Sequence, residues 1–120
     1  MGTLGVGLFA TPDADAMQLR NLVLGHLLSA GIVYAVVKAL GVTSASRALA
    51  FALSLFSMIV TRSVHPPGGG LVVLYVDSGL LRSLGGWFLI WPGLCSGLYV
   101  YAMASLFRAV RSRLRRFAFP

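Results

Sequence analysis

The sequence predicts an all-α membrane protein with about three transmembrane helices and a broken or re-entrant segment at 65–70, from His65 to Gly70. Hydrophobic residues make up 58% of the 120 residues and charged residues only 11%, whereas soluble domains carry about 25% charged residues. The chain contains no glutamate, although helices of soluble proteins need a charged face to stay in contact with water. This length and composition indicate one membrane domain, 1–120.

Three apolar stretches are candidate membrane spans, at about 20–40, 46–64 and 86–110. A bilayer core is crossed by about 20 residues of helix, so the first and third stretches are long enough. The second is short, which suits a helix that ends inside the membrane at the double proline Pro66–Pro67. A short helical segment at about 70–77 and a basic C-terminal tail at 108–120 complete the predicted domain.

The distribution of positive charge predicts an orientation. With three crossings, the N-terminus and the connection 62–82 share one side, which carries Arg20, Arg62 and Arg82. The other side carries Lys38, Arg47 and five arginines of the C-terminal tail. Basic residues mark the cytoplasmic side, or the stromal or matrix side of an organelle. We therefore expect the C-terminus on that side of a bacterial inner membrane or of a plastid or mitochondrial inner membrane.

The arginine-rich tail has two interpretations because the formal net charge of the chain is +7. Nucleic-acid binding would use such a charge, but a basic cluster that directly follows a span is typical of topology and of contact with anionic lipid headgroups. We predict contact with lipid or a partner, and no nucleic acid. The residues are Arg108, Arg111, Arg113, Arg115 and Arg116.

The break after the second span predicts a binding site. A residue before proline is extended, so we expect His65 and Pro66 to be extended, and the carbonyls near 60–63 to lack partners because prolines donate no hydrogen bond. Gly68, Gly69 and Gly70 permit unusual backbone angles and close approach of a ligand. A helix over 71–76 would direct its N–H groups and positive end toward the same place, as broken helices do in transporters.

Positive charge near the break suggests a small anion as the ligand. Arg62 and His65 supply that charge, and backbone N–H groups of the glycines would donate hydrogen bonds. The alternative is an ordinary interfacial loop whose arginine reaches toward the headgroups. The first span adds a polar seam of Asn21, Gly25, His26 and Ser29, which serves either helix packing or the same site.

Conventional enzyme chemistry finds no support in this sequence. The two histidines, Cys95 and three aspartates are scattered and lack the spacing of a zinc site. A nucleophile with an adjacent base, or a phosphate-binding loop, is not evident. We therefore expect no enzyme activity, no metal and no cofactor.

Two motifs give the chain a family resemblance. The stretch TPDADAMQLRNLVLGHLLSAGI, then TRSVHPPGGG, then GGWFLIWPGL resembles the HPP family of integral membrane proteins, named for its His-Pro-Pro motif. The family pattern Q-x-R-N-x-x-x-G-H matches Gln18, Arg20, Asn21, Gly25 and His26. The pattern H-P-P-A/G-G matches His65, Pro66, Pro67 and Gly69, whereas Leu19 and Gly68 replace the usual proline and alanine.

The resemblance implies a compact four-helix membrane domain whose plastid and cyanobacterial members are associated with nitrite transport. It also implies that His26 and His65 meet across a helix interface, with Arg20, Asn21 and Arg62 nearby. The family's usual first helix would precede residues 2–7, so we expect a second copy, another membrane subunit or lipid to cover the exposed face.

Two functions therefore remain open at the level of sequence. The first is a transporter or channel for a small inorganic anion such as nitrite, with Arg20, Asn21, His26, Arg62, His65, Gly68, Gly69 and Gly70 as candidate ligands. The second is an accessory or structural subunit of a respiratory or photosynthetic membrane complex, in which the same polar residues brace the helices.

Overall fold

The structure is a computed structural model that describes the backbone of residues 2–11 and 14–118, and the side chains of 5–11, 14–110, 112 and 113. All regular elements within these residues are helical, which confirms the predicted all-α class. They are α1 (Gly2–Ala10), η1 (Asp15–Met17), α2 (Leu19–Leu40), α3 (Ser44–Val60), α4 (Pro66–Asp77), α5 (Gly79–Ser83), η2 (Gly85–Leu89), η3 (Ile90–Leu94) and α6 (Cys95–Ala118).

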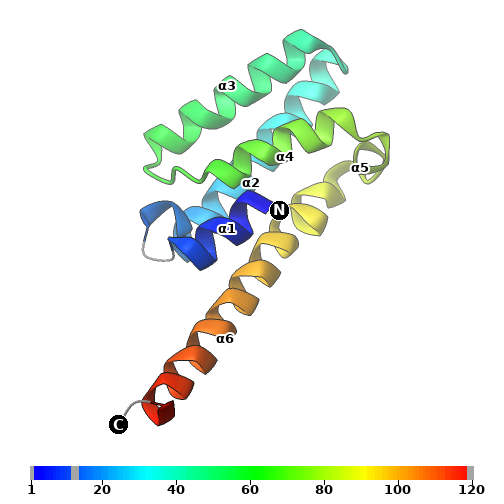
Figure 1. Cartoon of the computed structure of the whole chain (residues 1–120). Coiled ribbons are helices and arrows are strands. Elements are labelled where there is room, and N and C mark those ends of the chain that lie inside the picture. Colours follow the sequence, from blue (N-terminus) through cyan, green and yellow to red (C-terminus); the bar gives the residue numbers. More distant parts are fainter. Residues whose placement is uncertain (1, 12–13, 119–120) are drawn as a thin grey trace.

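Helix α2 is the centre of the molecule, because α3, α4 and α6 all pack against it (Figure 1). Leu22 in its first turn and the mid-helix residues Ala30 and Val33 are fully buried. Helices α3 and α4 lie beside it and run antiparallel to each other. A salt bridge between Arg47 at the start of α3 and Asp77 at the end of α4 ties the far ends of these two helices together.

Helix α6 runs antiparallel to α2. Gly97 lies against His26, Gly93 lies near Ala30, and Ala104 belongs to one apolar cluster with Leu22. Further along, the rings of Phe9 and Phe107 pack edge to face with their centroids 5.5 Å apart. The C-terminal part of α6 therefore lies at the end of the molecule where α2 begins, and it extends beyond the other helices (Figure 1).

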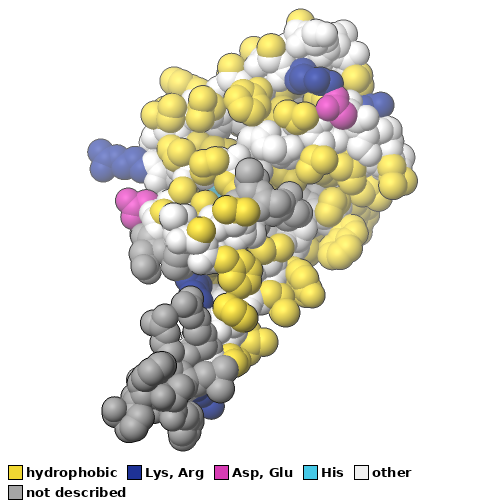
Figure 2. Space-filling model, viewed as in Figure 1, with side chains coloured by type: hydrophobic (Ala, Val, Ile, Leu, Met, Phe, Trp, Pro, Cys, Tyr) yellow, Lys and Arg dark blue, Asp and Glu magenta, His cyan; other side chains and the backbone are white. Residues whose placement is uncertain are grey.

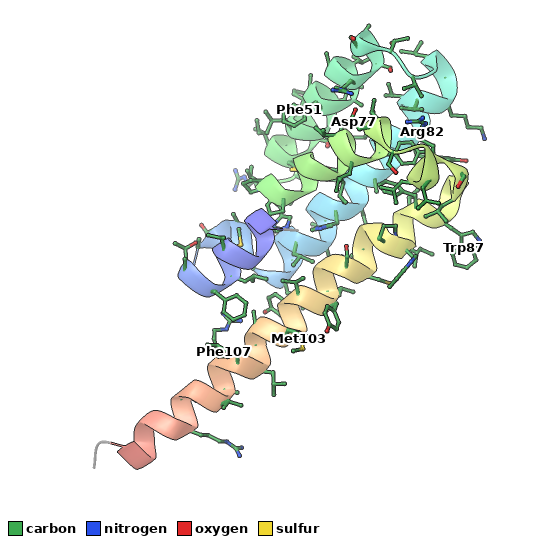
Figure 3. All side chains as sticks on the ribbon, turned by 45° about the vertical axis from the view of Figure 1, so that its right-hand side comes forward. Phe51, Asp77, Arg82, Trp87, Met103 and Phe107 are labelled. Carbon is green, nitrogen blue, oxygen red and sulfur yellow. The ribbon has the colours of Figure 1, made fainter. Side chains whose placement is uncertain are left out.

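The structure groups the charged residues differently from the predicted sides, because α4 runs along the helical layer from the Arg62 end to the Arg47 end. Its 12 residues span about 18 Å, so Arg62, which lies beside Arg20, is at one end of the layer. Asp77 and Arg82 are at the other end, near Arg47 (Figure 3). Helix α6 then returns the C-terminal arginines to the end that carries Arg20 and Arg62. Lys38, Arg47 and Arg82 form the opposite group.

The surface is that of a membrane protein. Two helices, Leu19–Leu40 and Gly85–Val110, are long and apolar enough to cross a membrane, and Ser44–Val60 is a shorter apolar helix. Large apolar side chains such as Phe56 (65% exposed), Val60 (66%) and Trp87 (70%) face outward, which water would disfavour over so wide an area. Figure 2 shows hydrophobic side chains spread over the visible face of the helices, with charged ones at its edges.

The break between α3 and α4 lies at Thr61–His65, a few residues before most of the predicted segment. The Arg62 N–H donates to the Ile59 carbonyl at 3.1 Å, and the Ser63 N–H donates to the Met58 carbonyl at 2.8 Å. This is a Schellman motif, which usually places glycine at the left-handed position; here Arg62 occupies it with φ 51°. Val64 and His65 then cross to α4.

Two predictions about the break need correction. His65 is extended as predicted (φ −135°), but Pro66 and Pro67 form the first turn of α4, where a missing N–H costs nothing. The carbonyls near 60–63 are also not bare. The Arg20 guanidinium donates to the carbonyls of Thr61 (3.4 Å) and Arg62 (3.3 Å), so α2 caps the end of α3.

Candidate functional site

The two histidines of the chain meet in the interior. His26 lies on α2 and His65 precedes α4, yet their ring centroids are 4.9 Å apart with an angle of 41° between the planes. His26 is 1% exposed and His65 is fully buried. The contact implied by the family resemblance is therefore present. The pair lies between the two apolar clusters of the molecule, one around Leu22 and the other around Ala30.

Three glycines let the backbones come close enough for this contact. A Cβ on Gly25 would lie 2.5 Å from the Cβ of His65, and one on Gly68 would lie 2.8 Å from the Gly25 carbonyl oxygen. On the other side of the pair, a Cβ on Gly97 of α6 would lie 2.9 Å from Nε2 of His26. Any side chain at these positions would push α4 or α6 away from α2.

The hydrogen bonds of the histidines define the state of each ring. Nδ1 of His26 bonds to the Leu22 carbonyl at 2.9 Å, and Nδ1 of His65 bonds to the Ala16 carbonyl at 2.6 Å. A carbonyl oxygen only accepts hydrogen bonds, so each Nδ1 carries a hydrogen. In a neutral ring, Nε2 is then an acceptor with a lone pair. Neither Nε2 has a hydrogen-bond partner within the described part of the chain.

Ser29 is a third buried polar group without a partner among the described residues. It lies three positions after His26, which places it on the same side of α2, and it is fully buried. A serine inside a helix usually bonds to a carbonyl of the preceding turn. Its hydroxyl is able both to donate and to accept a hydrogen bond, whereas each neutral histidine Nε2 only accepts.

The loop before α2 holds the pair in place from the α1 side. The Asn21 amide donates to the Asp15 carbonyl at 2.6 Å, and the Gln18 amide donates to the Asp15 carboxylate at 2.8 Å. These bonds fix η1, whose Ala16 carbonyl accepts from His65. Asn21 is therefore committed to the backbone of η1, next to the pair.

An apolar cavity of about 170 Å³ adjoins His65. It opens between α3 and α4, on the side of the break. Its lining combines side chains of α3, the break and the first turn of α4: Phe51, Leu55, Met58, Val64, His65, Pro66 and Gly69. Apart from the His65 ring, this lining is apolar.

The three glycines after the double proline do not form the predicted ligand loop. Gly68, Gly69 and Gly70 are helical residues of α4, and none has a positive φ. The first two positions of α4 are prolines without N–H groups, and the Gly68 N–H donates to the His65 carbonyl at 2.9 Å. The start of α4 thus offers fewer free donors than predicted. Gly68 serves helix packing instead, and Gly69 lies next to Phe51.

The remaining predicted site residues fall into two groups. Arg20 and Arg62 are exposed and adjacent, since the Arg20 guanidinium bonds to the Arg62 carbonyl. In the tail, Arg113 is exposed and Arg108 donates to Ser105 Oγ at 3.1 Å. The side chains of Arg111, Arg115 and Arg116 lie outside the described residues.

The sequence predicted part of this site. Asn21, Gly25, His26 and Ser29 stood out by their spacing along one side of the first span, but that spacing does not separate packing from binding. The carbonyls of Ala16 and Leu22 carry no sequence signal, because every residue has one. No group of three or more His, Cys, Asp or Glu side chains able to hold a metal ion occurs in the described ranges.

The fold and this interior define an integral membrane domain built around a buried polar pair. The family model for the HPP transmembrane region matches residues 1–117, and the chain belongs to the HPP family. It is similar to two transmembrane proteins of Dictyostelium discoideum. One is 33% identical over 114 residues, covering 92% of the chain and 36% of that protein. The other is 32% identical over 117 residues, covering 94% and 40%.

The chain thus spans well under half the length of these two relatives. No solved structure matches it significantly.

Proposed function

We propose that the chain is a transport domain for a small inorganic anion of the nitrite type. The observation that carries the proposal is the buried contact between His26 and His65, whose Nε2 atoms have no partner among the described residues. Burying a polar group without a hydrogen bond is unfavourable, and a fold that only braced its helices would gain by satisfying these atoms. A ligand that bonds to them explains why they are left available.

Electrostatics at the break support the same proposal. Arg20 and Arg62 are exposed at the end of the helical layer where the His65 segment begins. Their positive charges would attract an anion toward that end and raise its local concentration. The tail arginines Arg108 and Arg113 belong to the same end of the molecule, where we propose that they contact anionic lipid headgroups.

The test is nitrite flux into vesicles that contain the purified full chain, compared with protein-free vesicles. The informative variant is His65→Asn, because an asparagine amide can still donate to the Ala16 carbonyl while Nε2 is removed. We expect His65→Asn to reduce the protein-dependent flux at least tenfold. The matched control is Tyr99→Phe, since Tyr99 is 67% exposed on the surface of α6.

Equal nitrite flux for the wild-type chain and His65→Asn would contradict the role of the pair. Absence of any protein-dependent flux, together with recovery of the chain only inside a large complex, would contradict transport altogether. The chain would then be a structural subunit whose histidines brace α2 against α4.

A further inference from the structure

The buried pair has a chemical property that an anion alone does not satisfy. Each Nδ1 hydrogen is used by a backbone carbonyl, so each neutral ring presents only the lone pair of Nε2. The oxygens of nitrite also present only lone pairs. Two acceptors cannot form a hydrogen bond with each other, and one more hydrogen is needed between them.

We propose that the His26–His65 pair binds a small weak-acid anion only together with one proton, which lies in a hydrogen bond between a ligand oxygen and a histidine Nε2. This inference rests on the proposed function. The proton comes from water on the side where the anion enters and leaves with it on the other side, so that the atoms balance. Whichever of the two atoms holds the proton more tightly, the bound unit adds no net charge.

The cavity beside His65 supports a neutral unit. Its other lining side chains are apolar, and an isolated anion is far more costly to bury among such groups than a neutral molecule. The cavity volume of about 170 Å³ greatly exceeds that of one water molecule, whose share of liquid volume is about 30 Å³. A small protonated oxyanion would therefore reach His65 without carrying its charge through this space.

Ser29 adds the complementary group. Its buried hydroxyl lies on the same side of α2 as His26, is fully buried and lacks a partner in the described part of the chain. A protonated oxyanion has one O–H group and at least one oxygen that only accepts. A histidine lone pair would accept a hydrogen bond from the O–H group, and the serine hydroxyl would donate one to the other oxygen. A bare anion has no O–H group, so it would leave the histidine lone pairs without a partner.

The other charged and titratable groups are not buried beside the pair, where they would have to lie in order to take the place of the proton. Among the residues whose side chains the structure describes, no charged group of α2, α3 or α4 is buried with the pair. The bonds of Arg20 and Asp15 go to the break and to Gln18. The charged and titratable side chains that the structure describes on the elements around the pair are Asp15 of η1, Arg20, Tyr34 and Lys38 of α2, Arg47 of α3, Arg62 of the break, Tyr75 and Asp77 of α4, and Cys95, Tyr99, Tyr101, Arg108 and Arg113 of α6. Of these only Tyr75 is buried, and it packs against Phe88, two to three turns further along α4.

The experiment is calorimetric titration of the detergent-purified full chain with sodium nitrite in two mildly acidic buffers that differ in ionisation enthalpy. Proton uptake makes the observed heat depend on the buffer, and the dependence gives the number of protons taken up. We expect about one proton per bound nitrite. His26→Asn and His65→Asn, which keep a donor for each carbonyl, should lose both the heat and the proton uptake.

The possible results separate the inference from the function on which it rests. Nitrite binding with the same heat in both buffers would overturn the inference and leave anion binding intact. Nitrate, the anion of a strong acid, should give no binding heat, and nitrate binding as tight as nitrite binding would also overturn it. Absence of nitrite binding, with no flux in vesicles, would overturn both. The buffer comparison uses the wild-type chain, so it does not depend on whether a variant folds.

Discussion

Three glycines, Gly25, Gly68 and Gly97, determine how closely the two histidines approach each other. Each occupies a point where a Cβ would meet a neighbouring backbone atom or a histidine side chain within 3.0 Å. The sequence indicated Gly25 as a packing residue through its spacing with Ser29. It did not indicate that His65 is the residue packed there, because that contact joins positions 40 residues apart.

Gly25→Ala should destabilise the domain by about 1–3 kcal/mol, the usual effect of overpacking an interior. The new methyl group would lie 2.5 Å from the His65 Cβ, so α4 must shift. The measurement is thermal unfolding of the purified chain in detergent. The matched control is Gly31→Ala on the same helix, where a Cβ would meet no neighbouring atom within 4 Å.

Gly31→Ala should leave stability unchanged or raise it by up to about 1 kcal/mol, because alanine is the better helix former. If Gly25→Ala and Gly31→Ala change the stability of the chain by the same amount, the close packing of α2 against His65 is not a feature of the protein in its membrane environment.

Among the helices, the break after α3 shows how far sequence reasoning reaches. The double proline correctly marked the start of a new element and the extended His65. The glycines after it suggested a ligand loop, but helix packing against Gly25 and Phe51 holds them in α4. The left-handed residue is instead Arg62, and a non-glycine residue in that conformation has no recognisable pattern in the sequence.

Arg20→Gln should loosen the break by removing the bonds from the guanidinium to the Thr61 and Arg62 carbonyls. At 3.3–3.4 Å and in an exposed position, we expect a loss of about 1 kcal/mol. Amide hydrogen exchange should become faster at 61–65. Arg113→Gln, which removes the same charge from the exposed tail, should leave exchange at the break unchanged, and an equal effect of both variants would exclude the capping role.

Gly97→Ala tests the contribution of α6 to the site. The methyl group would lie 2.9 Å from Nε2 of His26 and 3.3 Å from a Leu22 methyl. It would therefore compete for the space next to the proposed ligand atom, and nitrite affinity should fall at least tenfold by calorimetry. Unchanged affinity would show that the ligand does not approach His26 from the side of α6.

The whole molecule differs from the sequence-based topology in one respect that matters for orientation. The three predicted apolar stretches correspond to two helices long and apolar enough to cross a membrane, Leu19–Leu40 and Gly85–Val110, and one shorter apolar helix, Ser44–Val60. We propose that α4 is a fourth, shorter pass. The segment 71–76 is too short to span by the usual rule, and only its packing beside α2 and the Arg47–Asp77 salt bridge reveal its direction.

A fourth pass by α4 makes a testable prediction about which residues share a membrane side. In a Cys95→Ser background, Thr61→Cys and Ser112→Cys should react with an impermeant thiol reagent from one side, and Ser83→Cys from the other. The three-crossing alternative pairs Thr61 with Ser83 instead. Since Arg20, Arg62 and five tail arginines oppose Lys38, Arg47 and Arg82, the positive-charge rule still predicts the C-terminus on the cytoplasmic, stromal or matrix side.

The central claim is that two buried histidines present bare Nε2 atoms to one ligand. Nitrogen-15 NMR of histidine-labelled protein tests this directly, because the chain has only two histidines and His26→Asn or His65→Asn assigns each signal. We predict the Nδ1–H tautomer for both rings, and a change in both Nε2 signals when nitrite is added. A hydrogen on Nε2 in the ligand-free protein, or Nε2 signals that do not change when nitrite is added, would contradict the claim.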